Sequence, residues 1–299
     1  MELLNDVLQF LINALSLGGL YALMALGLAL VYGILRLVNF AYGELVMVGG
    51  YTLLLFGRGA LPWMSIALLC IGMAVVTSLL LERVAFRPVR SASPNTMLIT
   101  SFAVSAFLQN AAILFISPRH LAVPMPSFFV ENWRIGDLLV SKANVLSLVV
   151  SLTVLGLLTL FLRRTILGSA LRAAADDFVM TRLLGIRANQ VIAVAFALSG
   201  GLAGVVALFW IGRSGTVAYS IGLTPVLIAF VATVIGGMDS LAGAVLGGYL
   251  LGFITIGLQL LLPQRLLDYR QAFTFLIVIL VLLFRPQGLI RGAISRERI

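Results

Sequence analysis

The chain has 299 residues, of which 61% are hydrophobic and only 10% carry a charge. A water-soluble globular domain carries roughly 25% charged residues, so this composition excludes that class. The formal net charge of +9, from 20 Lys and Arg against 11 Asp and Glu, would suggest nucleic-acid binding in a soluble protein. Here the cations stand in short connections between apolar runs. This placement indicates that the charges orient the chain in a membrane. We expect them to contact membrane lipids or a partner protein, and not nucleic acid.

Long apolar runs follow one another along the chain. A helix that crosses ~30 Å of hydrocarbon at about 1.5 Å per residue needs about 20 mostly apolar residues. The runs are 7–35, 37–57, 59–81, 91–118, 143–162, 188–212, 214–238, 240–264 and 271–284. Glu44 interrupts the second run, and the last is short unless Leu266 and Leu267 extend it. The sequence predicts an all-α polytopic membrane protein with eight or nine transmembrane segments, in one transmembrane domain over residues 1–299.

The arginines predict which connections lie in the cytoplasm. No cation precedes the first run, so that run is expected to be a retained helix rather than a signal peptide. The arginine-rich connections are expected inside and the others outside. The inner group is 82–90, 163–187 and the tail after Phe284; the outer group is 119–142 (an external loop of about 117–142), 213–223 and 263–270. If 37–57 is a full span, the N-terminus is expected outside. If 37–57 is re-entrant, the chain has eight spans and the N-terminus is expected inside.

Residues for covalent chemistry are scarce. A phosphate-binding loop needs glycine-rich backbone before Lys and Ser or Thr, but the single lysine, Lys142, follows Leu139-Val140-Ser141. One histidine, His120, and one cysteine, Cys70, form no metal-ligand or nucleophile set. The sequence therefore predicts no catalytic residue, no metal site and no cofactor bound by this chain. Transport is the favoured function class.

The connection 163–190 has 28 residues and is too long and too apolar for a plain loop. Small and apolar side chains recur near helical spacing in it, and Gly185 suits a helix C-terminus that needs positive φ. We expect a short amphipathic cytoplasmic helix over about 173–185 that docks on a partner. The alternative is a helix that lies on the lipid surface.

Four ordered motifs carry a resemblance to a known family. Ala173-Ala174-Ala175-Asp176, followed by Gly185-Ile186, resembles the coupling loop of ABC-importer permeases. The others are Asn39-Phe40-Ala41-Tyr42-Gly43-Glu44, Gly236-Gly237-Met238-Asp239-Ser240-Leu241-Ala242-Gly243 and Arg285-Pro286-Gln287-Gly288-Leu289. Together, over about residues 13–289, they resemble the LivH type of branched-chain amino acid permease. Position 42 is Tyr where many members have His.

The resemblance implies a permease subunit of an ABC importer for branched-chain or related small amino acids in a bacterial inner membrane. It implies a homologous permease, two ATPase subunits that hydrolyse the ATP, and a soluble substrate-binding protein as partners. The residues expected to contact the ATPase are Arg172, Ala173, Ala174, Asp176, Asp177, Leu184, Gly185 and Ile186. The alternative is a secondary transporter for a small solute that uses Glu44 as a proton or cation site.

Two acids fall at or near membrane depth, where an ionised carboxylate costs at least ~2.5 kcal/mol. Glu44 lies between Gly43 and Gly49-Gly50, which predicts a broken helix lining a cavity. The candidate pathway or gate residues are Asn39, Tyr42, Gly43 and Glu44. Alternatively, Glu44 caps a helix end or pairs with Arg36. Asp239 is expected in a tight cytoplasmic turn between two spans.

Glycines four residues apart predict close helix packing, because small residues let backbones approach. The candidates are Gly200, Gly204, Gly243, Gly247, Gly248 and Gly252. Some of these faces are alternatively part of an interface with the second permease.

Overall fold

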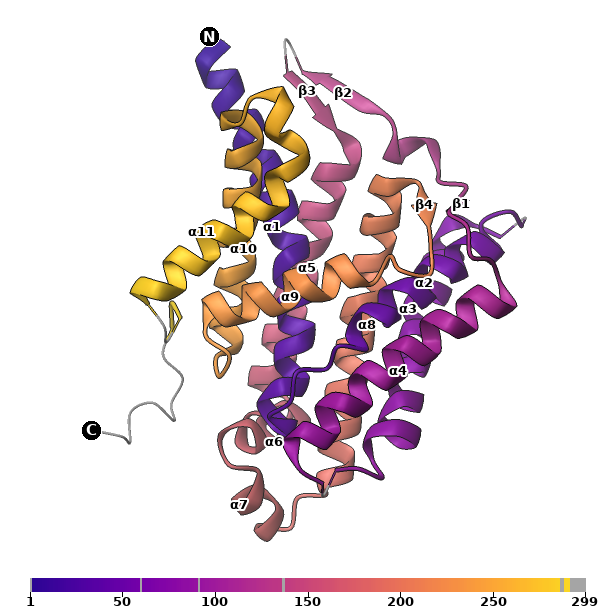
Figure 1. The fold of residues 1–299 in the computed structure, drawn as a ribbon, viewed down its shortest axis with the longest axis vertical. Helices are drawn as coiled ribbons and strands as arrows, with labels where there is room; N and C mark the ends of the chain where they lie inside the picture. Colours follow the sequence, from indigo (N-terminus) through magenta and orange to yellow (C-terminus); the bar gives the residue numbers. More distant parts are fainter. Residues whose placement is uncertain (1, 60, 91, 136–137, 286–287, 291–299) are drawn as a thin grey trace. The chain divides into compact units, whose positions relative to one another are not determined.

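The computed structural model describes residues 2–59, 61–90, 92–135, 138–285 and 288–290. Helices dominate it (Figure 1). They are α1 (Glu2–Leu35), α2 (Tyr42–Phe56), α3 (Trp63–Leu81), α4 (Pro94–Phe115), α5 (Lys142–Arg164), α6 (Ile166–Asp176), α7 (Phe178–Leu183), α8 (Ala188–Ser214), α9 (Leu223–Gly236), α10 (Leu241–Leu261) and α11 (Arg270–Phe284). A π-helical segment, η1 (Glu82–Phe86), continues α3, and two 3₁₀ segments are η2 (Ser127–Phe129) and η3 (Gln264–Tyr269).

Seven helical segments of the described chain are long and apolar enough to cross a membrane. They are Asn5–Leu35, Trp63–Phe86, Asn95–Phe115, Lys142–Arg164, Ala188–Ser214, Leu241–Leu261 and Gln264–Phe284. Two further apolar helices, α2 and α9, have 15 and 14 residues, too few to cross ~30 Å at about 1.5 Å per residue. The prediction of an α-helical polytopic membrane protein is confirmed. The last span, Gln264–Phe284, includes Leu266 and Leu267, which lengthen the short 271–284 run.

The two short helices differ from the runs predicted for them because the backbone leaves the helix inside an apolar stretch. Residues 36–41 are not α-helical, so α2 starts only at Tyr42. Gly215, with φ 65°, ends α8, and β4 (Thr216–Val217) and turns precede α9. Apolar composition does not show where such breaks fall.

The chain divides into two compact units. Unit 1 comprises Met1–Leu26, Pro126–Leu157 and Ile228–Ile299, and unit 2 comprises Gly27–Met125 and Leu158–Leu227. The predicted gate and coupling residues all belong to unit 2, together with Gly200 and Gly204. The other four packing glycines belong to unit 1.

Glycines bring helix backbones into direct contact in unit 1. A Cβ added at Gly248 would lie 2.3 Å from Ala22 N, and one at Gly252 would lie 2.3 Å from Gly18 Cα. At Gly247 it would lie 2.0 Å from Ala232 O, and at Gly243 it would lie 2.3 Å from Gly236 O. These glycines therefore let α10 approach α1 and α9 more closely than any side chain would permit.

Two of the family-like motifs meet in unit 1. Gly237 has φ 107° in the turn between α9 and α10, which is where Asp239 was expected. Ser240 caps α10, since its Oγ accepts a hydrogen bond from Gly243 N at 3.0 Å. Leu289 N donates to Ile235 O at 2.8 Å, so the Gly288-Leu289 motif lies against the end of α9.

In unit 2, α2, α3 and α8 pack against one another and form the core. Gly204 allows this because a Cβ there would lie 2.6 Å from Ile71 Cα of α3. At Gly200 an added Cβ would lie 2.7 Å from Ser78 Cβ, and Ser78 Oγ donates to Phe196 O at 2.6 Å. Phe86 and Phe196 pack with ring centroids 5.5 Å apart.

The predicted external loop contains regular structure. β1 (Leu121–Ala122) pairs antiparallel with β4, so the start of this loop meets the 213–223 connection that was expected on the same side. β2 (Asn132–Ile135) and β3 (Leu138–Ser141) form an antiparallel hairpin that leads into α5 (Figure 1). At its base Lys142 forms an ion pair with Glu131 and lies 5.8 Å from the Trp133 ring centroid.

Candidate functional site

A buried carboxylate lies where α2 and α4 meet in unit 2. The Glu44 side chain extends from the first turn of α2, and the residue is 1% exposed. Its Oε1 accepts hydrogen bonds from Ser105 Oγ at 2.8 Å and from Gln109 Nε2 at 2.7 Å. Ser105 and Gln109 are four residues apart on α4, so both point the same way. A buried carboxylate requires such donors, but no described residue donates to its Oε2.

The segment before α2 determines where this carboxylate lies. Asn39 Oδ1 accepts a hydrogen bond from Ala41 N at 3.0 Å, and Asn39 O accepts one from Tyr42 N at 3.2 Å. Such a side-chain turn competes with helix and explains why α2 begins after it. Glu44 consequently falls in the first turn, where the helix dipole favours a negative charge.

The neighbours of Glu44 in the candidate gate are tightly packed. Tyr42 is fully buried, and a Cβ added at Gly27 would lie 2.5 Å from its hydroxyl oxygen. A Cβ at Gly43 would lie 2.1 Å from Gly222 O, so the backbone of α2 touches the chain just before α9. Position 43 therefore has no room for a side chain.

The helix break predicted around Glu44 lies elsewhere. Gly49 and Gly50 are inside an uninterrupted α2, where added Cβ atoms would lie 2.7 Å from Ala207 Cβ and 2.9 Å from Val217 Cγ2. These glycines serve packing, and the break is the 36–41 segment. The Arg36 guanidinium, offered as a partner for Glu44, donates to Ala175 O at 3.0 Å, while the carboxylate receives its donors from α4.

The single helix predicted over 173–185 is two helices, α6 and α7. Thr165 caps α6 by accepting from Gly168 N at 2.9 Å, and Asp177 caps α7 by accepting from Met180 N at 2.9 Å. Asp177 has extended backbone and separates the two helices. Asp176 ends α6. Gly185 follows α7 with φ 84°, the positive value expected.

The expected ATPase-contacting residues differ in exposure. Arg172, Ala173, Asp176, Asp177 and Gly185 are exposed, Leu184 is 82% exposed and Ile186 is intermediate. Ala174 is only 2% exposed, because it faces the interior of unit 2. Its side chain is therefore not exposed on this chain, although Ala174 was among the residues expected to contact the ATPase.

Apolar side chains outside the expected ATPase-contacting set are also exposed on α6 and α7. Exposed members are Ile166, Leu167, Val179, Met180 and Leu183. We call these five residues, with Leu184, the apolar coupling surface. The available signal in the sequence was three pairs of adjacent apolar residues, at 166–167, 179–180 and 183–184. A connection surrounded only by water would not need apolar side chains at these positions.

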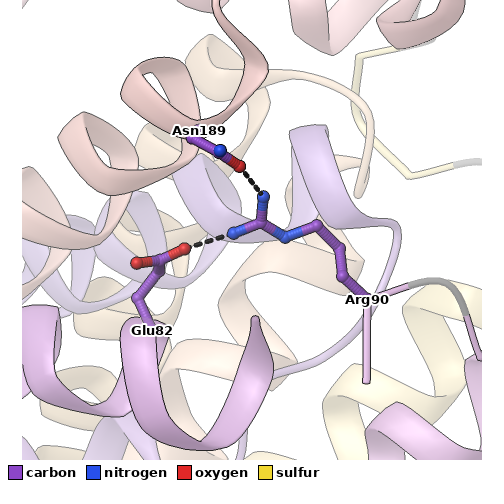
Figure 2. Close-up of polar contacts among 3 residues, drawn as sticks. All are labelled: Glu82, Arg90 and Asn189. Carbon is purple, nitrogen blue, oxygen red and sulfur yellow. Dashed lines mark hydrogen bonds and ion pairs between the residues drawn. The ribbon is translucent and has the colours of Figure 1, made fainter. Parts of the chain in front are cut away.

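A three-residue polar junction joins the start of η1, the first turn of α8 and the turn just before α4 (Figure 2). Arg90 forms an ion pair with Glu82 of η1 and donates to Asn189 Oδ1 at 2.7 Å. Asn189 is in the first turn of α8, and Arg90 is four residues before the start of α4. Partial burial lowers the pKa of the Arg90 guanidinium, and the Glu82 carboxylate opposes that shift. The junction also joins the 82–90 and 163–190 connections, which were both predicted to be cytoplasmic.

Comparison with known proteins places the chain in a family. The family described as "Branched-chain amino acid transport system / permease component" matches residues 10–282. The chain is 38% identical to the high-affinity branched-chain amino acid transport system permease protein BraD of Pseudomonas aeruginosa, over 95% of each chain. It is 34% identical to the permease protein LivH of Escherichia coli K12, again over 95% of each chain. A probable LivH of Methanocaldococcus jannaschii is 29% identical over 96% of this chain.

These matches cover nearly the entire chain and agree with the helical, polytopic fold. The chain therefore belongs to the family of permease components of branched-chain amino acid transport systems.

Proposed function

We propose that this chain is the membrane permease of an importer for branched-chain amino acids in a bacterial inner membrane. The observation that carries the proposal is the 38% identity to BraD over 95% of both chains. The family match does not favour the alternative of a secondary transporter at Glu44. The permease subunit is not itself an enzyme and relies on separate subunits for energy.

The proposed partners follow from the same assignment. They are a homologous permease, two ATPase subunits that hydrolyse ATP, and a soluble substrate-binding protein. The apolar coupling surface supports an ATPase contact, because its six apolar side chains lie on the connection expected in the cytoplasm. Exposed apolar side chains on a connection that faces water are typical of an interaction site.

The proposed translocation pathway passes beside the segment that contains Asn39, Tyr42, Gly43 and Glu44. Two observations support this placement: a non-helical segment precedes α2, and a buried carboxylate follows it. Irregular backbone at membrane depth is tolerated only where protein buries it or where it lines a cavity, and ionisable groups at that depth commonly mark transport routes.

Substrate competition tests the assignment. The complete complex, reconstituted in proteoliposomes with ATP, is expected to take up labelled leucine. Unlabelled isoleucine and valine should compete, while fructose should not. Fructose is the chosen control because a fructose import permease of Rhizobium meliloti is 29% identical over 45% of this chain. Competition by fructose, or uptake that isoleucine and valine do not affect, would contradict the proposed substrate class.

A further inference from the structure

Two arginines connect the α6–α8 region of unit 2 to the helices that hold Glu44. We propose that Arg36 and Arg90 are positioning residues that transmit movement of the coupling element, defined here as α6 and α7, to α2 and α4. The proposal rests on the proposed function, because it assumes that an ATPase moves this element.

Arg36 joins the coupling element to the segment before α2. Its guanidinium donates to Ala175 O at 3.0 Å, in the last turn of α6, and a Cβ added at Gly33 would lie 3.4 Å from Ala175 Cβ. Carbonyls in the last turn of a helix lack intrahelical donors and form the negative end of its dipole. A cation that donates there therefore holds the end of α6 against the end of α1.

The backbone of Arg36 provides a second observation. Its φ of 53° is the single positive value at a non-glycine position in the described parts of the chain. Arg36 N donates to Tyr32 O at 2.8 Å, so the residue ends α1 where glycine is usual. A non-glycine residue keeps a left-handed conformation only where surrounding contacts over-determine it. The contact of the side chain with α6 gives a reason for arginine at this strained position.

Arg90 joins the first turn of α8, which follows the coupling element in the chain, to the segment just before α4. The chain leaves α7, passes Gly185 and enters α8, whose first turn carries Asn189. Arg90 binds Asn189 and the buried Glu82 at the same time (Figure 2). A planar guanidinium suits this arrangement, because its donors have fixed relative directions. The start of α8 therefore cannot move without moving the chain just before α4, or breaking these contacts.

The two routes converge on the buried carboxylate. Arg36 is six residues before α2, and Arg90 is four residues before α4. Phe40 of the segment before α2 stacks on Phe102 of α4, with ring centroids 4.4 Å apart. Further along, Ser105 and Gln109 of α4 hold Glu44 of α2. Movement of the coupling element thus reaches the hydrogen bonds of Glu44 from both helices.

The experiment compares variants in the complete complex, reconstituted with its ATPase and binding protein. Arg36→Ala and Arg90→Ala are expected to retain the ATPase and its hydrolysis rate, while leucine transported per ATP falls about fivefold or more, as for coupling between distant sites. Arg36→Lys should restore coupling, because an ammonium also donates to a carbonyl. Arg90→Lys should not, because it lacks the planar fork. Arg58→Ala, at an exposed arginine outside these routes, is the control and should couple normally.

Arg36→Gly separates side chain from backbone. It relieves the positive φ but cannot donate, so it should behave like Arg36→Ala. Normal coupling in Arg36→Gly, or in both alanine variants, would overturn the proposal. Loss of ATPase association would also overturn it, since the arginines would then be docking or folding residues.

A distance measurement separates this proposal from the substrate assignment. Spin labels are placed at exposed positions 169 on α6 and 99 on α4, in a Cys70→Ala background. In the otherwise unaltered complex their separation should be the same with and without trapped ATP, because the elements move together. In the Arg36→Ala, Arg90→Ala double variant the two states should differ. A state-dependent distance with both arginines present would contradict the tethers, whatever substrate is transported.

Discussion

Gln109 Nε2 donates to Glu44 Oε1 at 2.7 Å, across 65 residues of sequence and between two helices. Ser105 Oγ donates to the same oxygen. Hydrogen bonds from Ser105 and Gln109 therefore link α4 to α2. A buried carboxylate is costly, so its presence beside an irregular segment favours a role in transport over packing alone.

Glu44→Gln is expected to preserve assembly and to impair transport. The glutamine oxygen accepts the same two hydrogen bonds, but it lacks the charge that makes such bonds roughly twice as strong. Leucine uptake by the complete complex should fall about fivefold or more. Thr52→Val is the control, because Thr52 is also buried on α2 but donates within its own helix, to Val48 O. Normal uptake by an assembled Glu44→Gln complex would leave Glu44 with a structural role only.

Two glycines three residues apart on α8 give a test of helix packing. Gly204→Ala would place a Cβ 2.6 Å from Ile71 Cα and should destabilise by about 1–3 kcal/mol, as overpacking does. Gly201→Ala would place a Cβ 3.7 Å from Val75 Cγ2, an ordinary contact, and alanine favours helix by about 1 kcal/mol. Thermal unfolding in detergent should show a lower Tm for the first variant alone. Equal Tm values would mean that α3 and α8 are not packed as described.

The apolar coupling surface predicts where the ATPase binds. Leu183→Asp combined with Leu184→Asp should greatly reduce co-purification of the ATPase, because two charges would enter an apolar contact. Val130→Asp, at an equally exposed apolar residue in the predicted external loop, is the control and should have no effect. Full ATPase recovery with the double variant would mean that this surface contacts lipid instead. Ala174→Trp is not a suitable test, because its buried position would make it a folding variant.

Gly185 tests the conformation of the turn between α7 and α8. Its φ is 84°, and apart from its chain neighbours no atom of the described residues lies within 4 Å of an added Cβ, so backbone strain is what opposes a substitution. Gly185→Val should weaken ATPase binding, because β-branched residues avoid positive φ. Gly185→Asn should bind nearly normally, since asparagine tolerates that region. Equal binding by the two variants would show that the turn does not position α7.

Much of the fold follows from the sequence for simple physical reasons. Apolar runs of about 20 residues have few alternatives to membrane helices, and Gly185 was recognisable because few other residues adopt positive φ at a helix end. The turn at Asp239 was predictable because a short polar stretch there separates two apolar runs.

The site was less accessible to sequence reasoning because its contacts join distant segments. Ser105 and Gln109 lie 61 and 65 residues from Glu44, within a run in which no periodicity marks them as partners. Gly49 and Gly50 read as a helix break, yet neighbouring helices use them for packing. Ala174 read as a docking residue, but burial of one face of α6 depends on tertiary contacts that spacing alone does not specify.

The most direct test of the importer assignment is the energy source for uptake. Proteoliposomes that contain the complete complex should accumulate leucine when ATP is supplied on the ATPase side, with no ion or proton gradient imposed. The same chain without its partners should accumulate none, with or without a gradient. Gradient-driven accumulation by the chain alone, or ATP-independent uptake by the complete complex, would contradict the assignment.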